Sequence, residues 1–250
     1  MRIGFACYGH ACVNPPAILV QALEKNYGPV PALRGIDLEV AAGEAIAVLG
    51  PNGAGKSTLL NLLSGLTRPN KGTLEIGAGE PCKDRRHARA RIGLVGHETF
   101  LYPTLTAREN LIFAAKLYGV ANPKQRADEL LAEQDLSHAA HRAVKGFSRG
   151  MAQRVAIARG LIHNPPILLL DEPFTGLDHS STEMLCAKLC AIRDAGKTIV
   201  LVSHDLALAA KIADQAVLLV RGKIVHRCSG DQLTQSYLEQ QYRNAVVPRP

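Results

Sequence analysis

The sequence predicts an α/β protein with a mainly parallel β-sheet core, an antiparallel β subdomain and a helical subdomain. Two observations carry this prediction. In the second half of the chain, short apolar segments alternate with helix-patterned segments, which is typical of a parallel sheet covered on both faces. Between residues 97 and 165 the pattern is helical instead, as expected for a subdomain attached to that core.

The first half of the chain contains several expected strands. Residues 33–40 alternate apolar and polar side chains, as in a half-exposed strand, whereas residues 45–49 form a short apolar run that leads into a glycine-rich loop. A helix with leucines along one face follows this loop. The other strands expected here are 18–25, 73–76 and 92–95.

Local signals also place the later elements. Thr106 and Glu109 form a capping box at a helix start, and Pro123 suits the first turn of another helix. After residue 165 we expect a strand at 167–171, a helix ending near 195, a strand at 198–203, a helix from 205, a hairpin of 216–220 and 223–226, and a terminal helix from about 231 to before 248.

Composition limits the classes of function. The chain has 250 residues and a formal net charge of +7. A basic balance favours an anionic partner, such as a nucleotide, a nucleic acid or a membrane surface, but an ordinary solvated surface gives the same charge. No apolar run approaches the roughly 20 residues that cross a bilayer, so any path through a membrane must come from another chain. Residues 1–16 lack the apolar core of a secretory signal.

The six cysteines form neither a zinc pattern nor a haem-attachment motif. Cys186 and Cys190 are four residues apart on an expected helix, where packing thiols are favoured over ligands. This cysteine usage fits a reduced cytoplasmic compartment.

Residues 50–58 match the phosphate-binding pattern G-x-x-x-x-G-K-[ST] in full. Its glycines let backbone N–H groups point at phosphate oxygens, and the helix that follows adds its N-terminal partial charge. We expect Lys56 on the β- and γ-phosphates and the Ser57 hydroxyl on Mg²⁺. A plain strand-to-helix turn would not need Lys-Ser after the second glycine. The expected nucleotide-binding residues of this loop are Gly50, Pro51, Asn52, Gly53, Ala54, Gly55, Lys56, Ser57 and Thr58.

Two strand ends carry the candidate catalytic groups. The apolar strand 167–171 ends in Asp171 and Glu172. Parallel sheets bind ligands at the carboxyl ends of their strands, so Asp171 is expected beside the loop as a Mg²⁺ ligand and Glu172 as the general base. The alternative is that both acids cap the next helix. The next strand leads to His204, which we expect to reach the γ-phosphate and to hold the water and Glu172.

The ordered set of motifs resembles the ABC ATPase family over roughly residues 18–225. The order is the loop at 50–58, a switch segment near His97, Phe147–Met151, the Asp-Glu strand, Gly176–Asp178 and Ser203–Asp205. The resemblance implies a P-loop NTPase fold that hydrolyses ATP, uses Mg²⁺ and forms a head-to-tail dimer with two ATPs at its interface. It also implies integral membrane transporter subunits as partners, at the cytoplasmic face of the cell membrane, and no nucleic acid partner.

The family's signature motif falls at Ser148, Arg149, Gly150 and Met151. Ser148 is a good N-cap, and a capped helix N-terminus is an anion site. The resemblance implies that this tip faces ATP bound by the other subunit, with Asp178 in the same interface; an ordinary N-cap is the alternative for Ser148. Tyr27 matches the family's aromatic adenine platform, and a core or turn tyrosine is its alternative.

Two departures from the family pattern are informative. His97 stands where the usual switch glutamine would be, which leaves its place on Mg²⁺ in doubt, and the signature has Arg149 and Met151 in place of Gly and Gln. Together with Asp-Glu-Pro-Phe-Thr-Gly-Leu-Asp, these residues look like the haem-exporter ATPase of cytochrome c maturation. The alternatives are an exporter ATPase for a drug, lipid or ion, and a soluble ABC ATPase acting on DNA or ribosomes.

The predicted organisation is an extension over residues 1–16, an ATPase domain over 17–230 with its helical subdomain at about 97–165, and a C-terminal helix and tail over 231–250. The apolar loop from His97 to Leu105 is the expected docking groove for the membrane subunits, with Phe100, Leu101, Tyr102 and Pro103 as its apolar residues. A buried local turn is the alternative for this loop.

Overall fold

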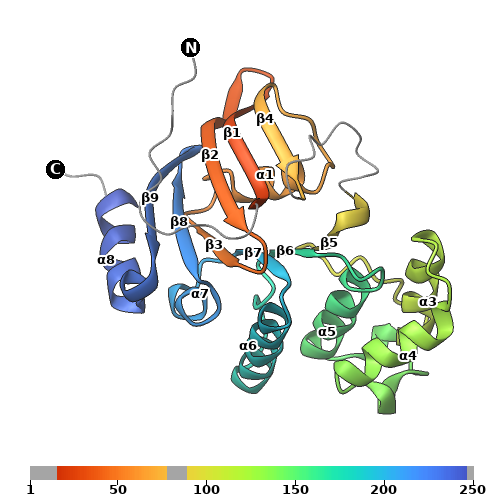
Figure 1. The fold of residues 1–250 in the computed structure, drawn as a ribbon. Coiled ribbons are helices and arrows are strands. Elements are labelled where there is room, and N and C mark those ends of the chain that lie inside the picture. The colour runs from red at the N-terminus through yellow and green to blue at the C-terminus, as the bar shows by residue number, and fades with distance from the viewer. Residues whose placement is uncertain (1–15, 78–88, 247–250) are drawn as a thin grey trace.

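A computed structural model describes residues 16–77 and 89–246 of the chain (Figure 1). Two sheets and a set of helices make up this part. The main sheet has six strands in the order β5-β6-β7-β3-β8-β9. The strands of this sheet are β3 (Ala45–Leu49), β5 (Ile92–Val95), β6 (Ile167–Asp171), β7 (Thr198–Val202), β8 (Gln215–Val220) and β9 (Lys223–Ser229). All neighbours in it are parallel except β8 and β9, which form an antiparallel hairpin.

The strands of this sheet are apolar on both faces because both faces are covered. Along β6, Leu168 and Leu170 pack in a cluster with α5 (Arg149–Gly160) and α6 (His179–Asp194). Leu169 belongs to a second cluster on the opposite face. That cluster contains α1 (Lys56–Leu63) and the smaller sheet, so β6 is buried between two layers.

The smaller sheet is antiparallel, as the sequence predicts, with the order β2-β1-β4. Its strands are β1 Pro16–Tyr27, β2 Val30–Ala41 and β4 Lys71–Ile76. The buried residues of β1 and β2 point at α1 and complete the core on this side of the main sheet. The three strands lie side by side in Figure 1, in the same part of the picture as α1.

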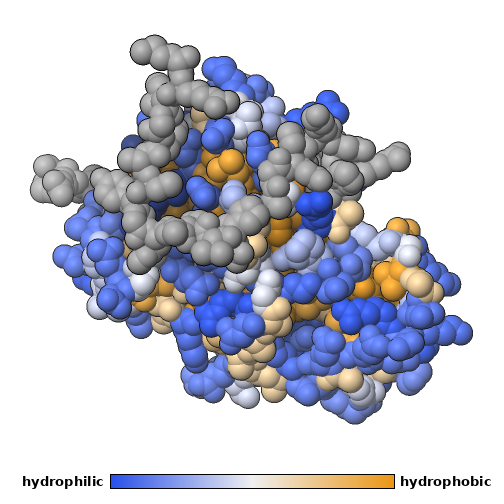
Figure 2. Space-filling model, viewed as in Figure 1, coloured by the Kyte–Doolittle hydropathy of each residue, from blue (hydrophilic) through white to orange (hydrophobic). Residues whose placement is uncertain are grey.

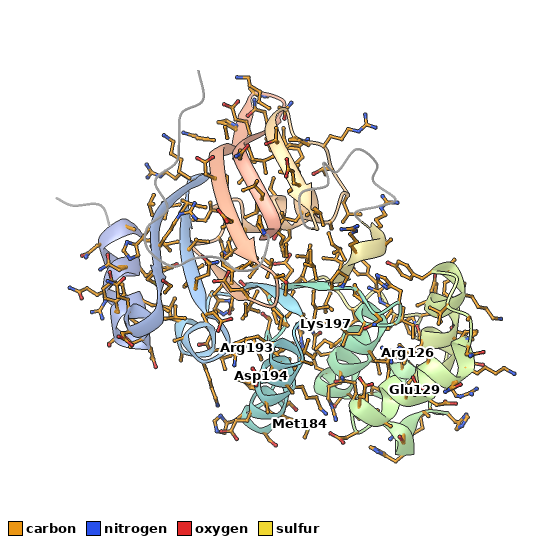
Figure 3. The ribbon with its side chains drawn as sticks, viewed as in Figure 1. Arg126, Glu129, Met184, Arg193, Asp194 and Lys197 are labelled. Atoms are coloured by element: carbon orange, nitrogen blue, oxygen red, sulfur yellow. The ribbon has the colours of Figure 1, made fainter. Side chains whose placement is uncertain are left out.

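Helices fill the chain between β5 and β6. They are α3 (Ala107–Leu117), α4 (Pro123–Glu133) and α5, with short 3-10 turns at Ser137–Ala139 and Val144–Gly146. The capping box of Thr106 and Glu109 is present, and Pro123 opens α4, so both predictions are confirmed. Arg126 of α4 forms an ion pair with Glu129 and donates to the Leu161 carbonyl at 3.3 Å, which ties α4 to the end of α5 (Figure 3).

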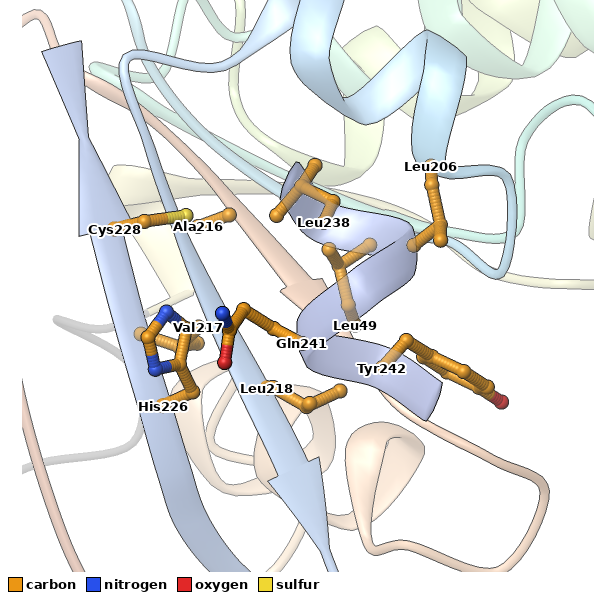
Figure 4. Close-up of a pocket in the computed structure, with 10 residues that line it drawn as sticks. All are labelled: Leu49, Leu206, Ala216, Val217, Leu218, His226, Cys228, Leu238, Gln241 and Tyr242. Atoms are coloured by element: carbon orange, nitrogen blue, oxygen red, sulfur yellow. The ribbon is translucent and has the colours of Figure 1, made fainter. Parts of the chain in front are cut away.

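The C-terminal helix α8 (Gln235–Val246) packs on β8 and on α7 (Leu206–Ile212). A cavity of about 10 Å³ remains between α8 and the β8-β9 hairpin, lined by Leu238, His226 and Cys228 among others (Figure 4). This is about one water in size. We expected this helix from about residue 231, but a 3-10 turn (Gly230–Gln232) comes first and α8 begins at Gln235.

Three other comparisons with the sequence predictions stand out. Pro16 pairs with Ala41 and so belongs to β1 rather than to an N-terminal extension. Cys186 is buried in the core, as expected of a packing thiol, whereas Cys7, Cys12 and Cys82 lie outside the described residues. Among residues 16–77 and 89–246, no helix has both the length and the apolar character needed to span a bilayer.

Candidate nucleotide site

The glycine-rich loop joins β3 to α1 and is shaped by positions that exclude a side chain. A Cβ at Gly50 would lie 2.1 Å from the Leu219 carbonyl oxygen, and one at Gly55 would lie 2.7 Å from the Ala32 carbonyl oxygen. Both residues also have positive φ, 150° and 109°. Gly55 is the N-cap of α1 and offers no side-chain capping bond, so the first N–H groups of the helix remain available for an anion.

The turn of the β8-β9 hairpin braces this loop. Gly222 donates its N–H to the Ala54 carbonyl at 2.9 Å and accepts from the Arg34 N–H at 2.8 Å. A Cβ on Gly222 would lie 2.6 Å from the Ala32 carbonyl oxygen, so only glycine allows this approach. The loop is thereby fixed between the two sheets before any ligand arrives.

Lys56 lies inside the curl of the loop, with 7% of the residue exposed. Its Nζ donates to the carbonyls of Gly50 at 2.7 Å and Pro51 at 3.1 Å. These neutral acceptors hold the ammonium group in the mouth of the loop without cancelling its charge. Ser57, the next residue, is exposed, so its hydroxyl is accessible to an ion or a ligand.

Asp171 and Glu172 lie where β6 ends. Asp171 pairs with Val202 of β7, and the Glu172 N–H donates to the Val202 carbonyl at 3.0 Å. In the strand order, β7 lies between the acidic strand β6 and β3 with its loop, a neighbour relation that the sequence analysis did not predict. Asp171 is therefore on the second strand from β3, at the end of β6.

Glu172 and His204 form a pair across the ends of β6 and β7. The Nδ1 atom of His204 lies 2.7 Å from Oε2 of Glu172. The Glu172 side chain is 17% exposed and that of His204 is 67% exposed, so one acid oxygen is held in the protein while the imidazole faces outward. Glu172 has φ of 52°, a left-handed conformation that non-glycine residues adopt at some cost and that often marks functional positions. Neither acid caps α6, whose N-cap is Asp178, so this alternative does not hold.

A magnesium ion fits the oxygen groups at this edge. Hydroxyl and carboxylate oxygens are the ligands that Mg²⁺ prefers, and it is commonly held by one or two of them plus substrate phosphates. Ser57 and Asp171 supply such groups. The described residues contain no cluster of three or more His, Cys, Asp or Glu that could hold a metal by themselves. His97 is exposed just after β5, the strand beside β6.

The residues matched to the signature motif form the start of α5, which packs on the face of the main sheet opposite to α1. Ser148 is the N-cap, and its hydroxyl accepts from the Met151 N–H at 3.2 Å. Gly150 is buried, and a Cβ there would lie 2.7 Å from the Ser181 hydroxyl. The start of α5 is therefore packed tightly against the start of α6, while Ser148 and Arg149 themselves are exposed.

Asp178 caps α6 by accepting from the Ser181 N–H at 2.7 Å. This backbone hydrogen bond lowers the pKa of Asp178. Tyr27, at the end of β1, is 49% exposed, with the Lys25 Nζ 5.2 Å from its ring centre. The ring is open to solvent, so it is not a core tyrosine and a flat ligand can stack on it.

The apolar loop after β5 borders a cavity of about 460 Å³. Phe100 and Tyr102 are 57% and 51% exposed, which rules out the buried turn for these two, whereas Leu101 packs against the core. Sequence reasoning missed the α3 side of this groove, although Phe113 and Leu117 are spaced four apart on that helix. Residues lining the cavity are Arg89, Phe100, Tyr102, Asn110, Phe113, Ala114, Leu117, Tyr118 and Arg159. Figure 2 shows orange, hydrophobic residues gathered at the α3 end of the molecule.

Comparison with known proteins agrees with this geometry. The family described as ABC transporter matches residues 33–175, more than half of the chain. The ABC transporter ATP-binding protein NatA of Bacillus subtilis (strain 168) is 36% identical over 83% of this chain and 85% of its own. The daunorubicin resistance ATP-binding protein DrrA3 of Streptomyces coeruleorubidus is 37% identical over 87% of this chain and 69% of its own. Among solved structures, a dimeric post-hydrolysis ATP-binding cassette bound to ADP and Pi matches with a TM-score of 0.75 and 29% identity, covering 85% of this chain and 98% of that one.

Proposed function

The chain belongs to the ABC transporter family and is an ATPase, and from this premise we propose that it hydrolyses Mg-ATP between two copies of itself to drive transport through separate membrane subunits. The observation that carries the proposal is the Glu172–His204 pair at the strand ends beside a braced phosphate loop. If Glu172 had only a structural role, it would not need a partner such as His204, whose side chain is 67% exposed at the strand ends.

Each residue of this edge has a role in the proposal. The loop from Gly50 to Thr58 binds the phosphates through its N–H groups, and Lys56 moves from its carbonyl acceptors to the β- and γ-phosphates. Ser57 and Asp171 hold the magnesium ion, which neutralises charge that develops on the phosphates. Tyr27 stacks on the adenine ring.

Glu172 acts as the general base in this scheme. The carboxylate orients the attacking water and accepts a proton from it as the bond to the γ-phosphorus forms and the bond to the bridging oxygen breaks. His204, 2.7 Å from Oε2, keeps the carboxylate in one orientation and donates to the γ-phosphate with its other ring nitrogen. His97 remains a candidate for indirect contact with the metal ion through water.

A second copy supplies the remaining contacts to each nucleotide. The N-terminus of α5 comprises Ser148, Arg149, Gly150 and Met151, of which Ser148 and Arg149 are exposed, and such a helix tip is suited to an anion. We assign it to the γ-phosphate held by the partner chain, with Asp178 at the same interface. The dimeric architecture of the cassette bound to ADP and Pi supports this arrangement.

The groove between the loop after β5 and α3 is assigned to the membrane subunits. Five of its residues, Phe100, Tyr102, Phe113, Leu117 and Tyr118, are large and more than 40% exposed. Contiguous exposed apolar surface of this kind marks interaction sites. In this proposal the chain works peripherally at the cytoplasmic face of the cell membrane, without a nucleic acid partner.

Two cargo classes remain for the whole transporter. The name of the DrrA3 relative supports a drug exporter, and an exporter of a drug, lipid or ion fits the relatives better than haem export does. Haem export for cytochrome c maturation is kept as the second candidate on the residues Gly96-His97 and Phe147–Met151. Purifying the chain with its membrane subunits and measuring ATPase stimulation by daunorubicin or by haem decides between them.

The dimer is tested with a variant that binds ATP without turnover. We expect Glu172→Gln to form a stable dimer with Mg-ATP, measured by size-exclusion chromatography with light scattering. Adding Ser148→Asp keeps a good N-cap on α5 but places a negative charge at the proposed phosphate contact, so the dimer should be lost. Ser148→Asn, an equally good cap without charge, is the matched control and should retain most of it. A monomer in the first variant, or a dimer unaffected by Ser148→Asp, contradicts the proposal.

A further inference from the structure

One cation lies inside the apolar groove. Arg159, from the last turn of α5, lines the cavity together with the aromatic residues of α3 and of the loop after β5. Its guanidinium carbon is 5.7 Å from the centre of the Phe100 ring. The residue is largely shielded from solvent, and this burial lowers the pKa of Arg159.

The charge of Arg159 is not compensated by the described part of its own chain. A guanidinium has five N–H donors. Here one Nη2–H reaches the Leu94 carbonyl at 3.5 Å, a long bond, and the buried Nε–H has no acceptor. No carboxylate of residues 16–77 or 89–246 forms an ion pair with it. Partly buried charges without a partner are costly, so this arrangement favours a ligand with acceptor atoms.

The surroundings of Arg159 hold it in place for such a ligand. Phe100 covers the guanidinium from the loop and has φ of 51°, a left-handed conformation. Its ring lies over Gly96, where an added Cβ would be 2.6 Å from the Phe100 Cε2 atom. An added Cβ at position 96 would therefore displace the Phe100 ring from its place over Arg159. A second cation, Arg89, lines the same cavity, so the groove is apolar in its walls and positive in its charge.

We propose that Arg159 binds the carboxylate of an Asp or Glu side chain on a cytoplasmic segment of the membrane subunit, flanked there by apolar residues that fill the groove. This inference rests on the proposed function of the groove and names the chemistry of its occupant. A carboxylate can accept two N–H groups of a guanidinium, and here the terminal Nη groups are the donors in reach because the Nε atom is buried. An uncharged apolar segment would cover the charged guanidinium without supplying an acceptor.

The test is zero-length cross-linking in the complex purified with its membrane subunits. Arg159→Lys retains the positive charge and introduces an amine that a carbodiimide can join to a neighbouring carboxylate, which arginine cannot do. We expect a new cross-linked peptide that joins position 159 to an Asp or Glu of the membrane subunit, found by mass spectrometry and missing from the wild type. In parallel, Arg159→Gln should weaken retention of the membrane subunits about tenfold or more while ATP binding is unchanged.

Arg154→Gln is the matched control, because Arg154 is on the same helix and its Nη1 donates to the Gln134 carbonyl of its own chain at 2.8 Å. It should not change retention. A photo-reactive amino acid at Leu117, which is 72% exposed, tests separately whether the groove is the docking site. If position 117 cross-links to the membrane subunit but position 159 does not, the carboxylate contact is wrong and the docking site stands. If neither position 117 nor position 159 cross-links to the membrane subunit, the carboxylate contact and the docking site are both wrong.

Discussion

The phosphate loop and the groove beside α3 each contain a shielded cation, Lys56 and Arg159, but the two cations differ in their hydrogen-bond acceptors. At the loop, the Lys56 ammonium is satisfied by two carbonyls of the same chain at 2.7 and 3.1 Å. In the groove, the Arg159 guanidinium has one long bond to the described residues, and its buried Nε–H has no acceptor among them. The first site is therefore organised before its ligand arrives, whereas the second is left incomplete on the chain's own surface. This difference agrees with the two proposals, a small ligand at the loop and a protein surface over the groove.

Removing the proposed general base, Glu172, should give the largest effect that is confined to the nucleotide site. With Glu172→Gln we expect turnover to fall by about 10²–10⁴-fold, because a positioned general base contributes that much. ATP binding and attachment to membrane subunits should be retained. Assays of phosphate release and nucleotide binding measure these effects. Glu183→Gln, at an exposed position of α6, is the control and should keep full turnover. Normal turnover in Glu172→Gln would remove this residue as the base.

Lys56→Ala tests the loop alone. Losing charge-assisted hydrogen bonds to phosphate should weaken ATP binding by roughly 10–100-fold, which corresponds to about 1.5–3 kcal/mol. Equilibrium titration with a fluorescent ATP analogue measures the change. Lys211→Ala, an exposed lysine of α7, should bind ATP as the wild type does. Unchanged affinity in Lys56→Ala would contradict the assignment of the loop.

A substitution at Asn110, which lines the groove, tests that region. This residue is 3% exposed; its Oδ1 accepts from the Tyr102 N–H at 2.7 Å and its Nδ2 donates to the Thr106 carbonyl at 2.9 Å. Asn110→Leu leaves the Tyr102 N–H without its acceptor, at a cost of about 1–3 kcal/mol and a fall in Tm of roughly 2–10 °C, whereas the Thr106 carbonyl still accepts from the backbone N–H of residue 110. We expect weaker retention of membrane subunits with unchanged ATP affinity.

Thermal unfolding and co-purification measure the two effects of Asn110→Leu. The control is Asn122→Leu, since Asn122 precedes α4 without making a side-chain capping bond. A loss of ATP binding in Asn110→Leu would show that the two regions are not separable in this way.

The smallest effect concerns pH. His163 stacks on Tyr118 of the groove with ring centres 3.8 Å apart, and burial lowers the pKa of His163. Its folded pKa is then below the unfolded value of about 6.5, so below that pH the unfolded state binds more protons. The stability that neutral His163 contributes is present above about pH 6.5 and is lost as the pH falls through its folded pKa.

Urea unfolding of His163→Phe against the wild type at pH 5.5 and 7.5 measures this contribution. Phenylalanine retains an aromatic ring beside Tyr118 and cannot titrate. The wild type should lose more stability than the variant on going to pH 5.5. Equal losses would exclude His163 as the titrating group.

Local patterns allowed much of the fold to be predicted from sequence. The predicted strands 45–49, 92–95 and 167–171 match the observed bounds, because each is a short apolar run bounded by glycine, polar or proline residues. The hairpin around Arg221-Gly222 is confirmed for the same reason, as both residues have positive φ at a tight turn.

Non-local features could not be read in this way. The insertion of β7 between β6 and β3 depends on packing across the whole sheet, which no local pattern specifies. The left-handed φ of Glu172 and the exposure of Arg159 to the groove also follow from tertiary contacts. The roles of Ser148 and Asp178 toward a second chain stay predictions, since each side chain caps its own helix here.

The position of β3 has a consequence for how the protein is made. Ala45 pairs with Ile199 on one side and Leu49 with Leu218 on the other, so both neighbours of this strand leave the ribosome long after it does. At typical synthesis rates the delay is on the order of 10–30 s. During that interval the five apolar residues of β3 have no strand to pair with, which exposes them to chaperones or to aggregation. A chain truncated before residue 198 would lack both β7 and β8, so β3 and the phosphate loop that follows it would have no neighbouring strands.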